Sequence, residues 1–378
     1  MVRSSTATTA TTDKKRKDRL KHISDLCGSL NKSKWGGESG DAVHFLGGSG
    51  DRTVKKLPTG SRKLDEALDG GWPFGRICEL FGPESGGKST LCLHAIQSFQ
   101  TIYPNEDVAI IDSEHSLDPE YAKKLNVDLE TLIVHQPDSG EQALNILELM
   151  IVGGVGLIIV DSVAALVPQH ELDGDIGDTH VALQARLMSQ ALRRLTGQIS
   201  KANAIVLFTN QIRDKIGVTW GDKTTTSGGR ALRFYASSRV EIVRIGSIKD
   251  GEVAVSNKVK ATVKKSKCSP PYRIANFNIT FGVGVDSAGE LLADAIDKKI
   301  IKKAGSWFSY GETQIGQGTM LVLDFLRENP DIATEIDIKC RELSETPKER
   351  KARVVEPEPE DDEQDTQEEN TKVEVEVI

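Results

Sequence analysis

The sequence predicts an α/β protein whose core is a mainly parallel central sheet. Between residues 51 and 286, short apolar segments alternate with helical patterns, as expected for strands joined by crossover helices. Within this region, the segment GPESGGKS at 82–89 joins a predicted strand to a helix predicted over 90–100. The predicted strands are 77–81, 107–111, 157–161, 204–209, 239–245, 259–264 and 276–281.

The chain divides by composition into four regions without an internal repeat. Its first twelve residues are rich in Ser, Thr and Ala; because Arg is sparse and no apolar segment follows, we expect a disordered cap rather than a transit peptide. A helical pattern then covers 13–35, and a glycine-rich linker covers 36–50. The regions are an N-terminal extension, a core, a small α/β domain and an acidic tail, at 1–50, 51–286, 287–345 and 346–378.

Composition excludes several classes of protein. The 378 residues are 38% hydrophobic and 28% charged, and no apolar run approaches 18 residues, so we expect no membrane span and no membrane partner. The five cysteines form no C-x-x-C pair, which argues against a zinc ribbon or a disulfide scaffold. This cysteine usage fits a reducing compartment, so we expect a cytoplasmic protein.

The acidic tail determines the net charge. Residues 356–378 hold eleven acidic residues and one lysine, a net of −10, whereas the whole chain has −8, so the rest of the chain sums to about +2. The tail contains no aromatic residue, and we expect it to be disordered. Two interpretations remain open: a solubilising appendage, or an electrostatic decoy that competes with nucleic acid for basic groups.

The segment 82–89 fits the phosphate-binding loop pattern G-x-x-x-x-G-K-[ST] at every fixed position. Gly82 and Gly87 allow the tight turn that directs backbone N–H groups at phosphate oxygens. Lys88 brings a positive charge to the outer phosphates, and the Ser89 hydroxyl can ligate Mg²⁺. The following helix adds its N-terminal dipole to the same site.

Polar residues follow three further predicted strands, at the sheet edge where ligands bind in such folds. Asp161 ends an apolar strand and is a candidate for holding Mg²⁺; the alternative is a residue that caps the next turn. Glu114 can activate a water molecule beside the γ-phosphate, with Asp112 as a rival and a solvated loop as the alternative. The amides of Asn210 and Gln211 can contact the γ-phosphate and respond to its loss.

Two long loops differ in character from the nucleotide segments. Residues 170–181 are polar, and residues 212–230 combine basic groups, Trp220, a threonine run and paired glycines. Cationic side chains beside an aromatic ring suit a single nucleic-acid strand. The alternative is a mobile surface loop without a ligand.

Together these segments resemble the RecA family of bacterial strand-exchange recombinases, from about Leu57 to the acidic tail. Besides the nucleotide loop, the resemblance rests on the segments Asp112-Ser113-Glu114-His115, Leu117-Asp118-Pro119 with Tyr121, Asp161-Ser162-Val163-Ala164-Ala165-Leu166, Asn210-Gln211-Ile212-Arg213 and Ala231-Leu232-Arg233-Phe234-Tyr235-Ala236-Ser237 with Arg239. It implies a phosphate-loop ATPase core with an N-terminal helix and a small C-terminal domain. It also implies polymerisation into a filament on single-stranded DNA, exchange with double-stranded DNA, and stimulation of a self-cleaving repressor.

The resemblance implies ATP and Mg²⁺ as cofactors and assigns residues to them. Ser89 and Asp161 would hold the metal. Glu114 would be the base, with Lys88, Gln211 and, from an adjacent subunit, Lys265 and Lys267 as further catalytic groups. The nucleotide contacts would be Gly82, Pro83, Glu84, Ser85, Gly86, Gly87, Lys88, Ser89, Thr90, Asp118 and Tyr121.

The resemblance also places two DNA-binding loops at 171–181 and 212–228, and a subunit contact at Phe234. The implied DNA contacts are Arg186, Ser189, Arg193, Arg213, Ile216, Trp220, Gly228, Gly229 and Arg230. Without the resemblance, these would be surface charges and a core aromatic residue.

The sequence departs from the family pattern at a few positions. Gly86 stands where a serine is usual and Ser89 where a threonine is usual, but both keep the required backbone and hydroxyl. The longer N-terminal region leaves open how its helix docks on a neighbour. Two rival functions follow from other classes: a hexameric ring helicase, and a regulatory module that holds ATP without hydrolysing it. The intact set Lys88, Ser89, Glu114 and Asp161 argues against the second.

Deleting residues 356–378 tests the two interpretations of the tail. If the tail competes for basic groups, its removal will speed binding to duplex DNA more than to single-stranded DNA. The difference will shrink as salt is added, because the competition is electrostatic. Stopped-flow binding rates of both forms across a salt series measure this effect, and equal duplex rates at low salt would leave a solubilising role.

Overall fold

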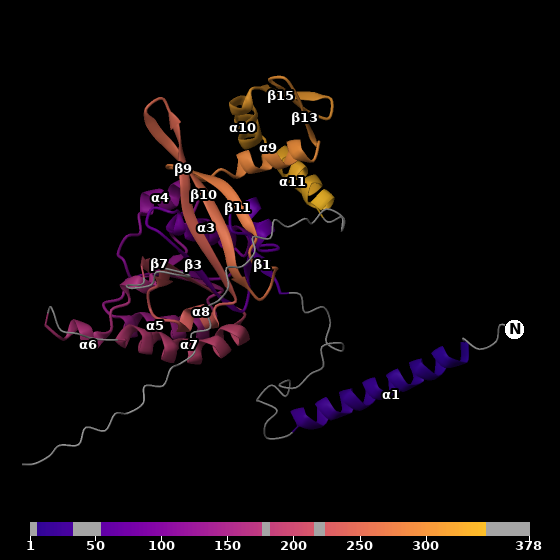
Figure 1. Ribbon diagram of the computed structural model, residues 1–378, viewed down its shortest axis with the longest axis vertical. Coiled ribbons are helices and arrows are strands. Elements are labelled where there is room, and N and C mark those ends of the chain that lie inside the picture. Colours follow the sequence, from indigo (N-terminus) through magenta and orange to yellow (C-terminus); the bar gives the residue numbers. More distant parts are fainter. Residues whose placement is uncertain (1–5, 33–53, 176–181, 215–223, 345–378) are drawn as a thin grey trace, which may run out of the picture. The chain divides into compact units, whose positions relative to one another are not determined.

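The structure is a computed structural model that describes residues 6–32, 54–175, 182–214 and 224–344 (Figure 1). The chain separates into two compact units, residues 1–54 and 55–378, and each is described by itself. Of the expected segments, the 36–50 linker and the acidic tail lie outside the described residues. Within the described residues, no helix combines the length and apolar character needed to cross a bilayer.

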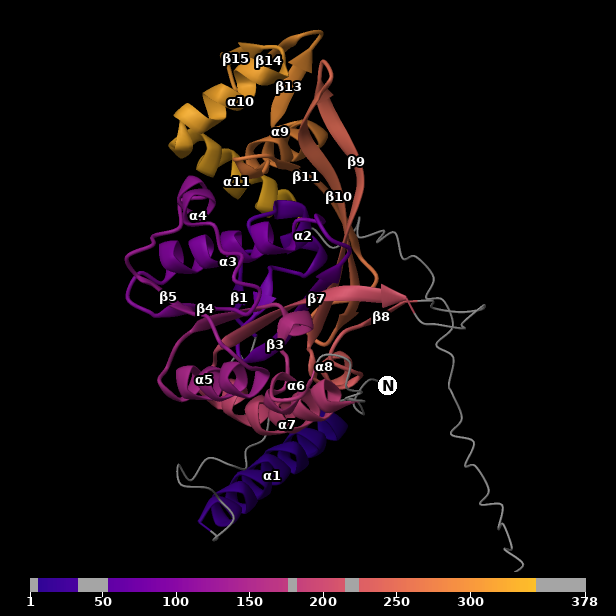
Figure 2. The same cartoon turned by 90° about the vertical axis from the view of Figure 1, so that its left-hand side faces the viewer.

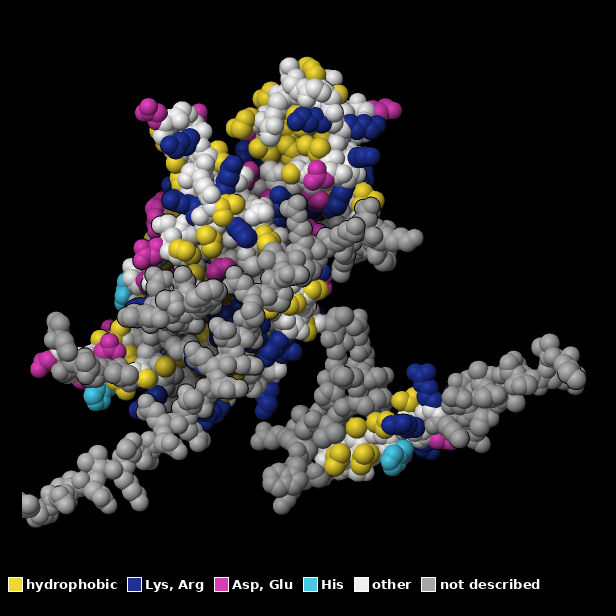
Figure 3. All heavy atoms as spheres, viewed as in Figure 1, with side chains coloured by type: hydrophobic (Ala, Val, Ile, Leu, Met, Phe, Trp, Pro, Cys, Tyr) yellow, Lys and Arg dark blue, Asp and Glu magenta, His cyan; other side chains and the backbone are white. Residues whose placement is uncertain are grey.

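The first unit contains helix α1, Thr6–Asn31. The helix predicted over 13–35 thus begins earlier and ends earlier, and the expectation of a disordered cap is wrong from Thr6 onward. The Ala and Thr run before the basic segment continues the helix instead of breaking it, since it contains neither Gly nor Pro. Leu20, Leu26 and Leu30 are exposed, and Figure 3 shows hydrophobic side chains gathered toward one end of this helix.

The second unit is built on a mixed sheet in the order β12-β11-β10-β9-β3-β7-β6-β4-β5, with β8 paired to β7. The strands from β5 to β9 in this order run parallel, whereas β10, β11 and β12 each run antiparallel to the preceding neighbour. The mainly parallel core that the sequence predicts is therefore confirmed. The strands are β3 Arg76–Gly82, β4 Val108–Asp112, β5 Leu132–His135, β6 Leu157–Asp161, β7 Ile205–Asp214, β8 Thr224–Thr226, β9 Ser238–Asp250, β10 Val253–Ser266, β11 Ile274–Thr280 and β12 Gly284–Val285.

Helices cover both faces of this sheet and bury two apolar cores (Figure 2). On one face, α3 packs with α2 and α4, and on the other, α5, α7 and α8 pack against alternate residues of the same strands. Along β3, for example, Cys78 and Leu80 face the first core, while Ile77 faces the second. The helices are α2 Arg62–Ala67, α3 Lys88–Ile102, α4 Pro119–Lys124, α5 Gly140–Val152, α6 Gln169–Leu172, α7 Leu183–Ala202 and α8 Ala231–Tyr235, with the 3₁₀ turn η1 at Val163–Ala165.

The structure differs from the strand predictions mainly at the sheet's periphery. Strand β7 runs on to Asp214, beyond its predicted end at 209, because residues 212–214 pair with β8. The expected 212–230 loop thus has a paired stem. Strands β5 and β12 were not predicted, since four and two residues are too short for a clear apolar alternation. A small pair, β1 Lys56–Leu57 with β2 Trp72–Pro73, precedes the sheet.

Residues 287–344 form a small α/β domain with its own apolar core. It consists of α9 Ser287–Asp297, β13 Ile301–Ala304, β14 Trp307–Tyr310, β15 Thr313–Gln317, α10 Thr319–Glu328 and α11 Pro330–Ser344. The buried Glu290 of α9 joins it to the core, because its carboxylate accepts hydrogen bonds from Ser61 Oγ at 2.8 Å and from Lys63 N at 3.2 Å. Burial raises the pKa of Glu290.

His94 links the helix after the nucleotide loop to β12. Its Nε2 accepts a hydrogen bond from Val285 N at 2.9 Å, and burial lowers its pKa to about 4, so the ring is neutral at neutral pH. Gly284 has a φ of +91°, and a Cβ there would lie 2.4 Å from His94 Nε2. The packing of β12 on α3 therefore requires glycine at this position.

Gly284→Ala should destabilise the protein through this crowding. Gly251→Ala is the matched control, because Gly251 also has a positive φ, +61°, but no atom lies within 4 Å of its added Cβ. We expect Gly284→Ala to reduce the free energy of unfolding by about 1–3 kcal/mol more than the control. Denaturant unfolding of both variants measures the difference, and equal losses would show that backbone strain alone matters.

Candidate functional site

The nucleotide loop connects β3 to α3 and is held by two crowded glycines. A Cβ at Gly82 would lie 2.0 Å from the carbonyl oxygen of Ile242, and a Cβ at Gly87, where φ is +97°, would lie 2.2 Å from Ile279 Cδ1. The backbone carbonyl of Ile242 on β9 leaves no room for a side chain at Gly82, whereas at Gly87 the Ile279 side chain on β11 would have to move and the positive φ itself disfavours other residues. The glycines are thus required for packing as well as for the turn.

Lys88 opens α3 and bends back over the loop. Its Nζ donates hydrogen bonds to Gly82 O at 3.0 Å and to Pro83 O at 2.8 Å. Burial lowers its pKa, while the carboxylates of Asp161 and Glu114 oppose that effect. Lys88 lines a pocket of about 470 Å³, together with the other residues of 84–90, Glu114, Asp161 and Gln211.

Ser89 and Asp161 come together at the end of β6. Ser89 Oγ donates to Asp161 Oδ2 at 3.0 Å, and Thr209 Oγ1 on β7 donates to Asp161 Oδ1 at 2.6 Å. Burial raises the pKa of Asp161, and these two hydrogen bonds oppose the shift. The described residues contain no group of three or more His, Cys, Asp or Glu that could bind a metal. A hydroxyl and one carboxylate still suit Mg²⁺, which keeps several waters and takes phosphate oxygens as ligands.

Glu114 and Asp112 are distinguished by their surroundings. Asp112 is buried, and its carboxylate accepts hydrogen bonds from Ser116 N, Leu117 N and Gln136 Nε2, each at 3.1 Å. Those bonds fix the turn after β4. Glu114 lines the pocket instead, where Ser162 Oγ donates a short hydrogen bond to its Oε1. Of these two carboxylates, it is thus Glu114 that faces the pocket.

Gln211 and Asn210 point to different places although they are adjacent. Gln211 lines the pocket, and its Nε2 donates to Glu114 Oε1 at 3.3 Å. Asn210 is fully buried, so its side chain cannot reach a nucleotide in the pocket. Of the two amides that the sequence left as candidates, only Gln211 faces the site.

Asp118 and Tyr121 lie on the side of the pocket formed by α4. Asp118 caps this helix by accepting hydrogen bonds from Glu120 N at 2.9 Å and Tyr121 N at 3.2 Å. The capped helix places the Tyr121 hydroxyl 3.0 Å from Thr90 Oγ1 on α3. Tyr121 therefore lines the nucleotide pocket, whereas Asp118 acts on it through the helix cap.

The stem of the 212–228 loop continues directly from Gln211. Arg213 Nε donates to Ser227 Oγ at 2.8 Å across the β7–β8 stem, and Arg230 is exposed just beyond it. Gly228 and Gly229 have φ values of +80° and +77°; added Cβ atoms would lie 2.7 Å from Val163 Cγ1 and 2.7 Å from Ala185 Cβ. Residues 227–229, where the chain returns from the loop to the core, form the returning limb of the loop. Through its two glycines, this limb packs on η1 and α7. Ile216 and Trp220 lie outside the described residues.

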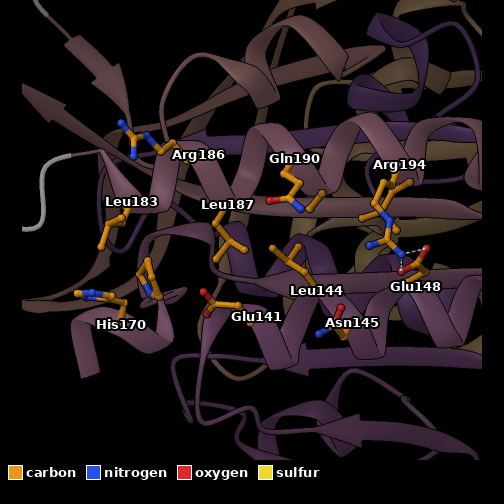
Figure 4. A pocket seen from close by; sticks show the side chains of 13 residues that line it. Glu141, Leu144, Asn145, Glu148, His170, Leu183, Arg186, Leu187, Gln190 and Arg194 are labelled. Carbon is orange, nitrogen blue, oxygen red and sulfur yellow. Dashed lines mark hydrogen bonds and ion pairs between the residues drawn. The ribbon is translucent and has the colours of Figure 1, made fainter. Parts of the chain in front are cut away.

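Helix α7 carries the other candidate DNA contacts on one face. Arg186, Ser189 and Arg193 are spaced three and four residues apart, opposite the buried Met188, Leu192, Leu195 and Ile199. A second pocket, of about 310 Å³, lies between α5 and α7. Figure 4 shows Arg186 near one end of it. At the other end Arg194 is paired with Glu148 at 2.6 Å, whereas neither Arg186 nor Arg193 has an ion-pair partner among the described residues.

Lys265 and Lys267 do not reach the pocket of their own subunit. In the sheet, Lys265 on β10 pairs with Arg239 on β9, and Arg239 pairs in turn with Glu79 on β3. Glu79 lies three residues before Gly82, the first residue of the nucleotide loop. Lys265 Nζ donates to the carbonyl oxygens of Arg233 at 2.8 Å and Phe234 at 2.9 Å, at the end of α8. Burial and nearby cations lower its pKa. On the same helix, Phe234 is 66% exposed.

The structure thus brings together Lys88, Ser89, Glu114, Asp161 and Gln211 around one pocket, and it brings Gly228 and Gly229 onto the helix that carries Arg186 and Ser189. Sequence reasoning missed the roles of Thr209, Ser162 and Gln136, which orient the site's carboxylates. For Thr209, the one signal available in the sequence was its position at the end of a predicted apolar strand.

Comparison with known proteins gives consistent matches over most of the chain. The family model of the RecA N-terminal domain matches residues 29–286, and that of the RecA C-terminal domain matches residues 289–345. A protein named RecA from Chlorobaculum parvum is 52% identical over 299 residues, which is 78% of this chain and 86% of the relative. Another from Clostridioides difficile is 47% identical over 326 residues, which is 86% of this chain and 92% of the relative.

Proposed function

The chain belongs to the RecA family, and we propose that it forms ATP-dependent filaments on single-stranded DNA and catalyses homologous pairing and strand exchange with duplex DNA. Family membership makes it a DNA-dependent ATPase of recombination and repair that binds DNA and self-associates. The observation that supports the finer proposal most strongly is the chain connection from Gln211, in the nucleotide pocket, into the stem of the second loop. From the family alone, we also propose a cytoplasmic location and stimulation of a self-cleaving repressor.

The nucleotide chemistry is assigned to residues that share the pocket. Residues 82–90 cradle the phosphates, Lys88 balances their charge, and Tyr121 borders the base. Ser89 and Asp161 hold Mg²⁺, which when bound neutralises charge on the phosphate oxygens. Glu114 accepts a proton as water attacks the γ-phosphorus and ADP leaves. The position of Glu114 in the pocket, beside Gln211, supports this role.

In this proposal, the two loops and α7 bind the DNA. Arg186, Ser189 and Arg193 contact the phosphate backbone, because they share the exposed face of α7 beside the returning limb of the second loop. Arg213 and Arg230 add charge at the stem, and Gly228 and Gly229 offer backbone N–H groups. Ile216 and Trp220 in the loop contact the bases.

In this proposal, the filament forms through a head-to-tail contact between subunits. Such an interface does not close on itself and therefore generates a helix. The exposed Phe234 packs on the neighbour, and Lys265 and Lys267 reach the neighbour's nucleotide. Neither lysine lines the nucleotide pocket of its own subunit, which supports action across the interface. The exposed leucines of α1 provide a second contact with an adjacent subunit.

Measuring ATP hydrolysis with and without single-stranded DNA, together with electron micrographs of the same mixtures, tests the proposal. We expect hydrolysis to rise on adding DNA, and extended filaments to form with an unreactive ATP analogue. Rings that unwind duplex DNA without extending it would favour the helicase alternative instead.

Glu114→Gln should separate nucleotide binding from hydrolysis. The substitution removes the proton acceptor and keeps the pocket's shape, so we expect turnover on single-stranded DNA to fall by roughly 10²-fold or more with little change in ATP affinity. Glu120→Gln, an exposed carboxylate on α4, serves as the control and should hydrolyse ATP normally. Undiminished turnover in Glu114→Gln would remove Glu114 from the role of base.

A mixing experiment tests whether Lys265 and Lys267 act across the interface. Lys88→Ala and the double variant Lys265→Ala/Lys267→Ala should each be inactive alone. In an equal mixture, about a quarter of head-to-tail contacts join an intact loop to intact lysines, so about a quarter of the activity should return. Restored steady-state ATPase activity supports action between subunits, and a mixture as inactive as its components would place the lysines elsewhere.

A further inference from the structure

Glu79 is a fully buried carboxylate in the middle of β3 that the nucleotide chemistry does not use. Its two oxygens bind different partners. Oε2 accepts a hydrogen bond from Arg239 Nε on β9, and Oε1 accepts one from Asn210 Nδ2 on β7 at 3.1 Å. A buried charge of this kind is stable only when it is paired and hydrogen-bonded, as it is here.

The amide of Asn210 extends this network to the second DNA loop. Its Nδ2 also donates to the carbonyl oxygen of Ser227 at 3.0 Å, and its Oδ1 accepts from Gln211 N at 2.9 Å. Both amide hydrogens are therefore engaged, one by Glu79 and one by Ser227. The same side chain thus holds the backbone of Gln211 and the returning limb of the loop.

Arg239 extends the network in the other direction. Its guanidinium lies over the ring of Phe81, 4.5 Å from the centroid, and Phe81 directly precedes Gly82. One set of contacts thus joins the start of the nucleotide loop, the strand that bears Gln211 and the end of the DNA loop at Ser227.

We propose that Glu79 is a positioning residue that couples the nucleotide pocket to the second DNA loop by fixing the orientation of the Asn210 amide. Glu79 orients Asn210, and Asn210 fixes Ser227 relative to Gln211. The inference rests on the proposed DNA-binding role of that loop. It predicts that loss of the Glu79 acceptor uncouples DNA binding from hydrolysis without removing any group that contacts ATP.

Glu79→Gln is the nearly isosteric test. Glutamine offers one acceptor oxygen where Arg239 and Asn210 both donate, so its amide nitrogen must face a donor and one contact is lost. We expect stimulation of ATPase activity by single-stranded DNA to fall by about tenfold, with DNA-independent hydrolysis and ATP affinity unchanged. Hydrogen exchange should increase specifically at the backbone amides of residues 224–230.

Glu290→Gln is the matched control for loss of stability. It makes the same change in another buried carboxylate that accepts two hydrogen bonds, but at the contact with the C-terminal domain. We expect it to lower the melting temperature and leave stimulation by DNA intact. If both variants lose stimulation equally, the effect is general destabilisation and the proposal fails.

The double variant Glu79→Gln/Asn210→Asp separates core pairing from loop positioning. The introduced glutamine can accept from Arg239 and donate to the introduced aspartate, so the buried charge is balanced again. The aspartate still accepts from Gln211 N, but it has no hydrogen to donate to the Ser227 carbonyl. Because the aspartate oxygen faces the Ser227 carbonyl without a hydrogen between them, we expect only partial recovery of the melting temperature, and no recovery of stimulation by DNA.

The outcomes separate this inference from the proposed function. A parent protein whose hydrolysis does not respond to single-stranded DNA would contradict the proposed function itself. A parent that responds, together with a Glu79→Gln variant that responds equally, would overturn only the role of Glu79. Recovery of both stability and stimulation in the double variant would also overturn it, because the Ser227 contact would then be dispensable.

Discussion

The parallel alignment of β4, β6, β7 and β3 is the constraint on which the site depends. Because these strands end at one edge of the sheet, Glu114, Asp161, Gln211 and the nucleotide loop meet although they are far apart in the sequence. The hydrogen bonds of Asp161 reflect this alignment, since it accepts from Ser89 on one side and Thr209 on the other. A shift of one residue in any of these strands would turn the functional side chains to the wrong face.

Local spacing in the sequence was sufficient to predict the part of the site that lies within single segments. The loop 82–89 has fixed geometry between a strand and a helix, and Asp161 ends an unbroken apolar strand. The choice between Asp112 and Glu114 could not be made in this way, because it depends on Gln136 and on the turn that Asp112 stabilises. The choice between Asn210 and Gln211 similarly depends on Glu79, which lies 131 residues away.

The fold was predictable where hydrophobic alternation extends over several residues and unpredictable where pairing is decided by tertiary context. The core strands and α3 were anticipated, whereas the extension of β7 depends on pairing with β8. Glu79 illustrates the same limit, since a polar residue in an apolar strand is typical of a solvent-facing position. Only the neighbouring strands show that this position faces a buried arginine and a buried amide.

The two glycines at the end of the second loop have a consequence for the evolution of the family. Gly228 and Gly229 have positive φ values, and side chains there would collide with Val163 and Ala185. Purifying selection would therefore preserve both residues in a descendant that had lost its affinity for nucleic acid. Their invariance in a set of related sequences would report an inherited backbone geometry, and exposed positions such as Arg186 and Arg193 would be the ones to diverge first.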